Sequence, residues 1–534
     1  MSETSSLFRA RPAMQSSECK AQRTETGIQL LKPTFYVAFF TLISRILGFV
    51  RDMLLARFFG TSAAMEAFLV AFRLPNFIRR LFAEGSVTQA LVPFLSAENH
   101  QKYRALFQRQ LITVTGVLMF FLTLIGMLFS GVVILIFAPG FIKDPLRFHL
   151  ANNLLKIMLP YGFFISVTSI FTAILNSRQH FSIPAMTPII LNVLMIACLI
   201  ISPLFPQPIY VVALAVLIAG VVQCLIQIPV LLKLKVRLKP ILKWPSQRLI
   251  GFLKRLLPAI FGASIIQISL LIETIFASFL PTGSLSWLYY AEQLNQFPLS
   301  IFGIALATVI LPYLARTVSN EDYSKILNFA VGFTLIIAVP ATAAIIILAK
   351  PLMITLFRYG HFTAFDVSQS SRVLIALAAG LSGFILIKVC VSALYARRNM
   401  KAVIRIGLFA ILINILLNFV LVFLLAPYHL GYLGLAVSTA VTANINALML
   451  LLILSLKYHF RLKGKSLGIL LLRVLMATTV MGAVLFVIEG NINSWLSLGI
   501  IARALKLFSF IAIGMASYFL CLILLGIRRR DFWL

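Results

Sequence analysis

Residues 33–57 read PTFYVAFFTLISRILGFVRDMLLAR, a largely apolar run that is long enough to cross a bilayer as a helix. Three charged side chains, Arg45, Arg51 and Asp52, interrupt this run. Charges inside a membrane are costly unless they face water or a partner, so a helix of this kind lines a polar interior. The stretch therefore predicts a bundle of membrane-spanning helices around a charged cavity.

Apolar runs of similar length recur from Pro33 to the end of the chain, with only short polar breaks between them. The chain of 534 residues is 61% hydrophobic and 11% charged, with a mean hydropathy of +1.01, and this apolar share exceeds that of soluble domains. We predict an all-α polytopic membrane protein of about fourteen transmembrane helices. The predicted spans are 33–57, 64–95, 106–138, 148–177, 184–203, 209–235, 245–279, 284–316, 322–358, 364–395, 399–426, 431–457, 466–489 and 498–526.

The distribution of basic residues indicates the topology. The net charge is +31, and the basic residues gather in alternate short loops, for example at Arg237 and again at Arg397 and Arg398. The positive-inside rule then places both termini in the cytoplasm, and the scatter over loops argues against nucleic acid as a partner. Residues 1–32 have no apolar signal-peptide core, so we predict a disordered cytoplasmic tail.

A shift of about 220 residues brings landmarks of the two halves of the chain together. Gly140 falls on Gly360, and Asp52 falls on Glu273. We predict two six-helix lobes around a central cavity, with two helices and a cytoplasmic tail outside the duplication. The first lobe is residues 33–244, the second is 245–465, and the remainder is 466–534. Chance matching among apolar helices is the alternative explanation.

Charged residues inside the predicted spans mark the interior of the protein. The acidic ones are Asp52, Glu66, Glu84, Glu273 and Glu292. The arginines of the first two spans are Arg45, Arg51, Arg73, Arg79 and Arg80. Arginine presents planar, permanently charged donors that suit phosphate oxygens, so we predict a cationic cavity for a diphosphate. For any single arginine, pairing with an acid or reaching the membrane surface is the alternative.

A second candidate site combines Glu273 with Asn414 and Asn418, which lie i,i+4 on one face of a predicted helix. Their oxygens suit Na⁺ or a proton site, and an interhelical hydrogen bond is the alternative. The sequence contains no nucleophile elbow, P-loop or metal-ligand spacing, so we predict a transporter without a cofactor, not an enzyme. Energy would come from a Na⁺ or H⁺ gradient, the membrane potential or consumption of the product.

Three motifs resemble the MurJ (MviN) family of lipid II flippases. They are SRILGFVRD at 44–52, EAFLVAFRLPNFIRR at 66–80 and FAEGS at 82–86. The resemblance implies the exporter-superfamily fold and alternating access, in which the diphosphate headgroup of lipid II crosses through the cavity while its undecaprenyl tail stays in the bilayer. It also implies diphosphate-binding cations at Arg45, Arg51 and Arg79, cavity lining by Ser44, Asp52, Asn76 and Ser286, and a sodium site at Glu273, Asn414 and Asn418.

Two positions depart from the family pattern. Glu66 stands where many members carry Asp, which keeps the charge. Gln293 follows Glu292 where the family has Arg, and Gln296 replaces a later carboxylate. We include Glu66, Glu292 and Gln293 among the predicted substrate contacts. The lost cation weakens the case for diphosphate contacts from the second lobe.

The predicted function is translocation of lipid II from the cytoplasmic to the periplasmic leaflet for peptidoglycan synthesis. We expect a monomer that works beside the cell-wall synthesis machinery. A flippase for another undecaprenyl-diphosphate sugar, such as an O-antigen unit, is the alternative with the same architecture. A multidrug cation antiporter is disfavoured because an arginine-rich cavity repels cations. A membrane scaffold for cell-wall enzymes would leave the intramembrane charges without a role.

Overall fold

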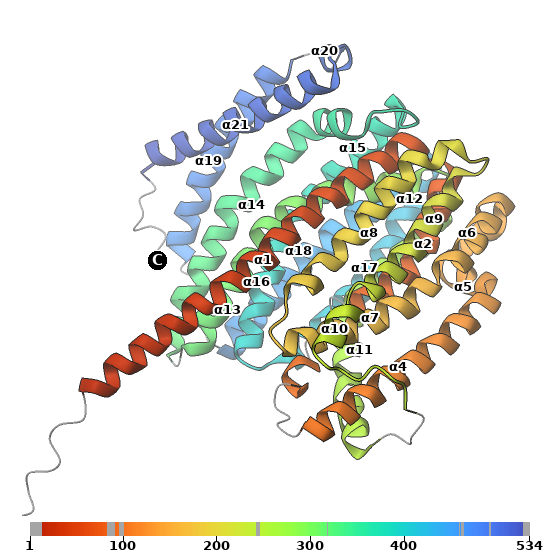
Figure 1. Cartoon of the computed structure of the whole chain (residues 1–534). Coiled ribbons are helices and arrows are strands. Elements are labelled where there is room, and N and C mark those ends of the chain that lie inside the picture. The colour runs from red at the N-terminus through yellow and green to blue at the C-terminus, as the bar shows by residue number, and fades with distance from the viewer. Residues whose placement is uncertain are drawn as a thin grey trace, which may run out of the picture.

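The computed structural model describes residues 13–82, 91–95, 101–241, 246–317, 319–458, 460, 464–490 and 493–526, and every regular element in these ranges is a helix. Most of the long helices run side by side in one bundle (Figure 1). The predicted all-α fold is confirmed. Glu84, which the sequence placed in the second span, lies outside the described residues.

Prolines begin several helices of the first lobe, as expected for a residue that fixes φ and has no N–H to donate. Pro145, Pro160 and Pro208 are the first residues of α6, α7 and α9. The elements are α1 Ala13–Phe59, α2 Ala63–Phe82, α4 Gln101–Leu128, α5 Ser130–Phe137, η1 Pro139–Lys143, α6 Pro145–Met158, α7 Pro160–Ser177, α8 Ser182–Ile201, η2 Ser202–Leu204, α9 Pro208–Leu225 and α10 Ile228–Lys233.

The second half of the chain shows the same order of helices. The broken pair α6 and α7 is matched by α15 and α16, and the helices that follow, α8 and α17, begin at Ser182 and Met400. The elements are α11 Gln247–Ser278, α12 Ser284–Pro298, η3 Leu299–Gly303, α13 Ile304–Arg316, α14 Asn320–Phe357, α15 Ala364–Ala378, α16 Leu381–Ala396, α17 Met400–Leu425, η4 Ala426–Tyr428, α18 Gly431–Tyr458, α19 Gly464–Glu489, α20 Asn493–Leu496 and α21 Ile500–Leu524. The lobe boundary at residue 244 stays a prediction, and "first lobe" and "second lobe" denote the predicted ranges below.

Among the described residues, ten helices are long and apolar enough to cross a membrane, or eleven if α15 and α16, bent by 43°, form one span. These eleven coincide with eleven of the predicted spans. The other three predicted spans correspond to α1, α2 and α11, which do not meet the same criterion over their described residues. The predicted count of fourteen is therefore not confirmed. In α1 and α2 the reason is physical, because their charged residues lower the hydropathy of the helix.

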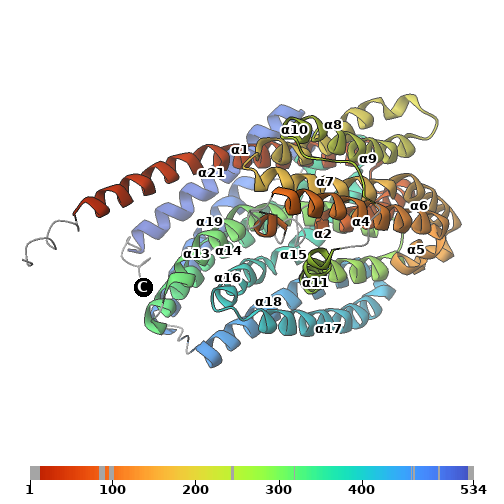
Figure 2. The ribbon, with the colours of Figure 1, turned by 60° about the horizontal axis from the view of Figure 1, so that its bottom comes forward.

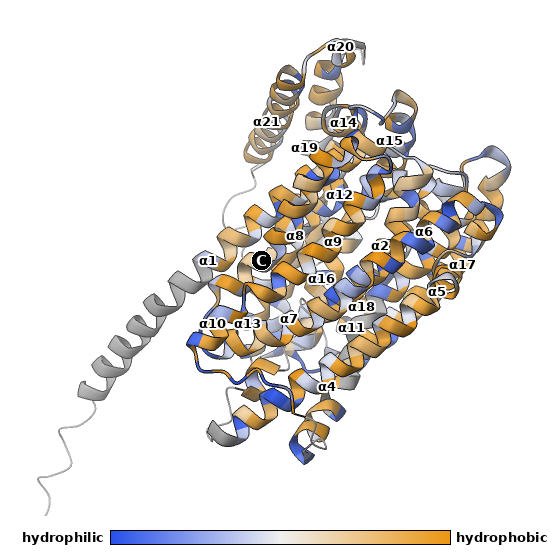
Figure 3. Cartoon of the chain, turned by 45° about the vertical axis from the view of Figure 1, so that its right-hand side comes forward, coloured by the Kyte–Doolittle hydropathy of each residue, from blue (hydrophilic) through white to orange (hydrophobic). Residues whose placement is uncertain are grey.

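Apolar side chains cover the outside of the bundle, which is the reverse of a soluble protein. Phe423 of α17 and Leu456 of α18 are 76% and 79% exposed. Figure 3 shows hydrophobic residues along most of the length of the helices and hydrophilic residues gathered in many of the connecting loops. This distribution is that of a multi-pass membrane protein whose solvent is lipid.

The first helix is longer than the sequence predicted. The predicted tail was residues 1–32, but α1 begins at Ala13 and continues through residue 33 to Phe59. This part of the chain is polar but rich in Glu, Gln, Lys and Ala, which favour helix. Residues 1–12 of the predicted tail lie outside the described residues.

The two lobes meet along helices that come from the start of each. In Figure 2 the red-to-yellow helices of the first lobe lie on one side, and the green-to-light-blue helices of the second lobe on the other. α2 packs against α11 and α12 across this boundary, while α1 packs against α8 and α11 against α17. The last helices, α19 and α21, pack on α14 outside the central boundary. The centre of the boundary between the lobes is therefore formed by α2, α11 and α12.

Candidate functional site

A cavity of about 240 Å³ lies where α1 and α2 face α11 and α12. Its lining carries four arginines, all from the first lobe, and a single carboxylate from the second lobe among the described residues. Leucine and phenylalanine side chains of α2 fill part of the wall. The charged lining residues are Arg51, Arg73, Arg79, Arg80 and Glu292. The cavity is therefore strongly cationic, as the sequence predicted.

Arg51 is held in place from three sides. Its Nε and Nη2 donate to Oδ1 of Asp52 at 3.0 and 2.8 Å, and its Nη1 donates to Oδ1 of Asn192 in α8 at 3.1 Å. The hydroxyl of Tyr289 in α12 donates to the same Asp52 oxygen at 2.8 Å. These bonds use three of the five guanidinium N–H groups, so two remain for a ligand.

Two arginines of α2 reach across to the second lobe. Nη1 of Arg73 donates to the carbonyl oxygen of Leu270 at 3.2 Å, and Nη1 of Arg80 donates to Oε1 of Gln267 at 3.4 Å. Both acceptors belong to α11 and carry no charge. These contacts join the lobes without neutralising the arginines.

Several predicted substrate residues come together in this cavity. Nε and Nη2 of Arg79 donate to Oδ1 of Asn76 at 3.1 and 2.9 Å, which fixes the guanidinium one turn along α2. Glu292 and Gln293 line the opposite wall with Arg51, and Asp52 lies directly behind Arg51. The structure thus unites residues that the sequence could only group by type.

Besides Asp52, four predicted residues do not line the cavity. The carbonyl of Ser44 accepts a hydrogen bond from Nδ2 of Asn192 at 2.9 Å, so Ser44 lies behind the Arg51 cluster. Arg45 is exposed on α1. Ser286 is fully buried, and its hydroxyl has no hydrogen-bond partner among the described residues. The fourth, Glu66, lies at a separate junction.

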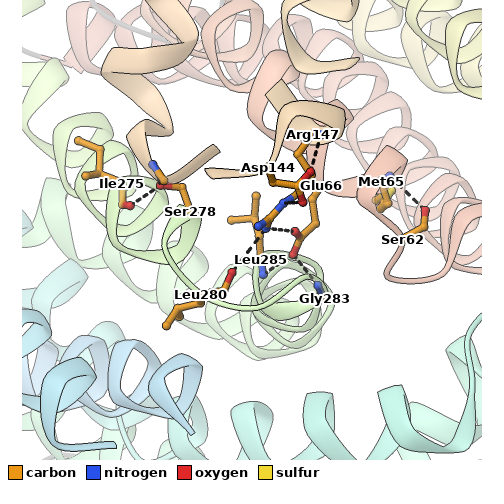
Figure 4. A network of polar contacts seen from close by, with 11 residues as sticks. Ser62, Met65, Glu66, Asp144, Arg147, Ile275, Ser278, Leu280, Gly283 and Leu285 are labelled. Atoms are coloured by element: carbon orange, nitrogen blue, oxygen red, sulfur yellow. Dashed lines mark hydrogen bonds and ion pairs between the residues drawn. The ribbon is translucent and has the colours of Figure 1, made fainter. Parts of the chain in front are cut away.

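Glu66 in α2 joins the two lobes and is 1% exposed. Its Oε1 accepts from the backbone N–H groups of Gly283 and Leu285, both at 2.9 Å, and its Oε2 accepts from Nη1 of Arg147 at 3.1 Å. Figure 4 shows the carboxylate between these groups. Because Gly283 and Leu285 lie at the start of α12, the partial positive charge of that helix end also favours the anion.

Arg147 completes this junction. Its Nε donates to Oδ2 of Asp144 at 2.7 Å, and its guanidinium lies 4.9 Å from the centre of the Phe141 ring. Partial burial raises the pKa of Asp144, but hydrogen bonds from the backbone and guanidinium of Arg147 outweigh this effect and hold the pKa below its usual value. The sequence placed Arg147 in an outside loop and gave it no role. We name the ion pair with its backbone contacts the Glu66 junction.

A second junction closes the same end of the bundle. Oδ1 of Asp366 in α15 accepts from Oγ1 of Thr61 at 2.6 Å and from Nε1 of Trp287 at 2.9 Å. Its Oδ2 accepts from Thr363, which completes the capping box of α15. Because Thr61 follows α1, the Asp366 carboxylate ties the second lobe to the first.

The predicted cation site is only partly assembled. Nδ2 of Asn418 donates to Oδ1 of Asn414 at 3.1 Å, and the hydroxyl of Ser438 donates to the side-chain oxygen of Asn418. No hydrogen bond joins Glu273 to either asparagine among the described residues, although α11 and α17 pack together. The same part of the chain contains no group of three His, Cys, Asp or Glu residues that could hold a metal ion. The two asparagines are therefore bonded within α17 and to Ser438 of α18, and the predicted site with Glu273 stays a prediction.

Sequence reasoning missed several residues of the two regions. They are Tyr289, Asn192, Gln267, Arg147 and Asp366. Only Tyr289 had a usable signal, because it precedes Glu292 and Gln293 by three and four residues and so shares their helical face. The other four had no such signal, because their partners Arg51, Arg80, Glu66 and Thr61 lie 81 to 305 residues away along the chain.

The family model described as "Lipid II flippase MurJ" matches residues 55–506. The chain is similar to the probable lipid II flippase MurJ of Vibrio cholerae, with 41% identity over 94% of this chain and 97% of the relative. It is similar to the lipid II flippase MurJ of Burkholderia cenocepacia, with 36% identity over 80% of this chain and 84% of the relative.

Solved structures give the same picture. The fold resembles a structure described as "Lipid II flippase MurJ, inward closed conformation", with a TM-score of 0.78, 25% identity and coverage of 91% of this chain and 97% of that one. A multidrug-resistance MATE transporter of the MOP superfamily in an inward-facing conformation matches with a TM-score of 0.62 at 15% identity, over 78% of this chain and 94% of that one. The second likeness concerns the fold alone.

Proposed function

The chain belongs to the MurJ family of lipid II flippases, and on this premise we propose that it moves lipid II from the cytoplasmic to the outer leaflet of a bacterial inner membrane. The observation that carries the proposal is the cavity with four arginines and a single lining carboxylate among the described residues. Guanidinium groups bind phosphate oxygens with two parallel hydrogen bonds, so this wall suits the diphosphate. The undecaprenyl tail would remain in the surrounding bilayer.

Arg51 and Arg79 are the best-placed contacts for the diphosphate. Asp52 and Asn192 hold the first, and Asn76 holds the second. Because their side chains are already oriented, less conformational entropy is lost when a ligand binds. Asp52 also lowers the cost of keeping Arg51 charged in the absence of substrate.

Transport requires the lobes to separate. The cavity of about 240 Å³ is below the ~300–1,000 Å³ of ordinary small-molecule sites, and a disaccharide-peptide headgroup is larger than most such ligands. The α2–α11 hydrogen bonds of Arg73 and Arg80 hold one side of the boundary, and the Glu66 junction holds another. We propose that these two sets of contacts break in turn, which is alternating access. Arg45, exposed in this conformation, would contact the substrate in a more open one.

The remaining predictions are kept as proposals. Glu273, Asn414 and Asn418 are proposed to bind Na⁺ or H⁺ and so to couple transport to an ion gradient or the membrane potential. Support comes from the packing of α11 on α17 and the burial of both asparagines. Cytoplasmic termini are supported by the loop charges. A monomer acting beside the cell-wall synthesis machinery is proposed as well.

The test uses cells depleted of this protein and supplied with the parent sequence or with Arg51→Ala or Arg79→Ala. Exposure of lipid II on the periplasmic face is measured, with expression checked. We expect the parent to restore exposure and both variants to fail. Arg405→Ala is the control, because Arg405 lies in a separate groove between α17 and α18.

Two outcomes would contradict the proposal. Lipid II that reaches the outer leaflet normally in depleted cells, while another undecaprenyl-diphosphate glycolipid accumulates inside, would transfer the function to an O-antigen type of substrate. Full rescue by both arginine variants would remove the cavity from the transport route.

A further inference from the structure

The two walls of the cavity differ in chemistry. All four lining arginines come from α1 and α2, whereas the polar lining of α11 and α12 is mainly uncharged. The polar residues of the second-lobe wall are Gln267, Tyr289, Glu292, Gln293 and Gln296. Among the described lining residues the second lobe contributes no cation. The cavity is therefore polarised from one lobe to the other.

We propose that the substrate binds in one orientation, with its diphosphate on the arginine wall and the uncharged sugar and amide groups of its headgroup on the glutamine wall. The proposal rests on the proposed function and adds a headgroup subsite to it. In this subsite, side chains of α12 bind the headgroup, which is the part of the substrate that distinguishes it from other diphosphate lipids.

The glutamine wall is a continuous helical face. Tyr289, Glu292, Gln293 and Gln296 follow the spacing i, i+3, i+4, i+7, which places their side chains in one stripe along α12. Two hydrogen bonds order this stripe. Tyr289 donates to Asp52, and Nε2 of Gln296 donates to Oε1 of Glu292 at 2.8 Å.

Gln293 is the centre of the stripe. It is half-buried in the cavity lining and makes no hydrogen bond with other described residues, so its amide can both donate and accept. Hydroxyl, acetamido and peptide groups need both kinds of partner. A glutamine amide matches them better than a guanidinium, which only donates.

Glu292 makes the same wall a poor place for the diphosphate. Its carboxylate lines the cavity beside Gln293 and would repel a phosphate placed there, although it accepts hydrogen bonds from sugar hydroxyls. The opposite wall carries four positive charges. Electrostatics therefore favours one orientation of the substrate over the reverse.

The test compares two ligands that share a tail and a diphosphate. Purified full-length protein in lipid nanodiscs is titrated with lipid II and with undecaprenyl diphosphate, which has no sugar or peptide. Gln293→Leu removes the amide at similar volume. We expect its affinity for lipid II to fall about tenfold, as the loss of one or two hydrogen bonds implies, and its affinity for undecaprenyl diphosphate to stay within about twofold.

Two further variants fix the interpretation. Arg79→Ala is expected to lower the affinity for both ligands by similar factors. Gln293→Arg is expected to raise the affinity for undecaprenyl diphosphate severalfold without an equal gain in the affinity for lipid II. Thermal unfolding of each variant shows that the fold is intact, and Arg405→Ala is expected to bind both ligands as the parent does.

The outcomes separate the two proposals. If Gln293→Leu lowers the affinity for both ligands equally, or changes neither affinity, the proposed headgroup subsite is wrong while the flippase function still stands. A parent protein that binds neither ligand would instead overturn the proposed function.

Discussion

Gly360 lies directly against Arg57, so that a Cβ added to Gly360 would be 2.2 Å from the carbonyl oxygen of Arg57. The same relation holds for Gly140 and Ser278, where the distance would be 2.3 Å. The two glycines are equivalent in the predicted repeat, and each touches the end of the first helix of the other lobe. Only glycine allows backbones to approach this closely. The end of the bundle that contains the Glu66 junction can therefore close only because Gly140 and Gly360 have no side chain.

Gly140→Ala is expected to open this end. Its φ is not positive, so alanine adds only a methyl group, and overpacking of this kind costs about 1–3 kcal/mol. At about 1.4 kcal/mol the open fraction rises about tenfold. The readout is labelling of a single cysteine, Leu69→Cys in the cavity, by a membrane-impermeant thiol reagent added outside cells whose native cysteines have been replaced.

Gly116→Ala is the matched control for this substitution. Gly116 lies in α4, and a Cβ there meets nothing within 4 Å. It should leave labelling at the parental level. If Leu69→Cys is labelled equally in the parent and in Gly140→Ala, the glycine contacts do not hold the end with the Glu66 junction closed.

Removing one partner of the Glu66 junction should destabilise the protein. Glu66→Ala removes the acceptor of two backbone N–H groups and one of the two carboxylates that pair with Arg147, while Asp144 remains. The cost is therefore about 3 kcal/mol, the lower end of the range for a broken buried ion pair. We expect the Tm of the purified protein to fall by several degrees. Arg147→Ala should do the same, and the double variant should lose less than the sum of the two.

An exposed ion pair provides the comparison. Glu321 and Lys325 pair at 2.9 Å on the surface of α14, where solvent screens the attraction. Glu321→Ala should therefore change the Tm little. Additive losses in the Glu66 and Arg147 variants would show that the two side chains act independently, against the structure.

Positioning of Arg51 by Asn192 is a further prediction. Asn192→Leu removes the acceptor of Nη1 while leaving Asp52 in place. A less ordered Arg51 should bind lipid II about three- to tenfold more weakly, since one hydrogen bond to a charged group contributes about 1.5 kcal/mol or more. Titration of the purified protein measures this effect, with Asn153→Leu on the exposed side of α6 as control. Unchanged affinity would mean that Asp52 alone orients Arg51.

The sequence predicted the helices and the cationic cavity because both depend on composition along single segments. Apolar runs gave eleven of the spans, and the charges that interrupt the first two predicted spans singled out Arg51 and Arg79. The count of fourteen is not confirmed partly because α1 and α2, which build one side of the site, carry several charged residues each and are less apolar than an ordinary span. The charged residues that identify α1 and α2 as functional also exclude these helices from the apolar spans.

The junctions between lobes could not be predicted in the same way. Glu66 had the expected residue type, and the sequence placed it in the cavity, but its partners Gly283 and Leu285 lie 217 and 219 residues away and use their backbone N–H groups. Backbone donors leave no trace in the side-chain sequence. Asp366 was likewise missed. Its bond to Thr61, 305 residues away, exists only because the lobes are in contact.

Thr61→Val tests whether the hydrogen bond from Thr61 to Asp366 helps to hold the lobes together at the end that contains the Glu66 junction. The substitution keeps the shape of the side chain and removes the one hydroxyl that crosses from the first lobe to Asp366, while Trp287 and the capping box of α15 remain. A hydrogen bond to a carboxylate contributes about 1.5 kcal/mol or more, so outside labelling of Leu69→Cys should rise about tenfold or more. Thr41→Val is the control, because the hydroxyl of Thr41 donates only to the carbonyl of Val37 in its own helix. Equal labelling of the two threonine variants would show that Asp366 caps α15 without helping to hold the lobes together. A rise confined to Thr61→Val would show that the Asp366 carboxylate both caps α15 and joins the lobes.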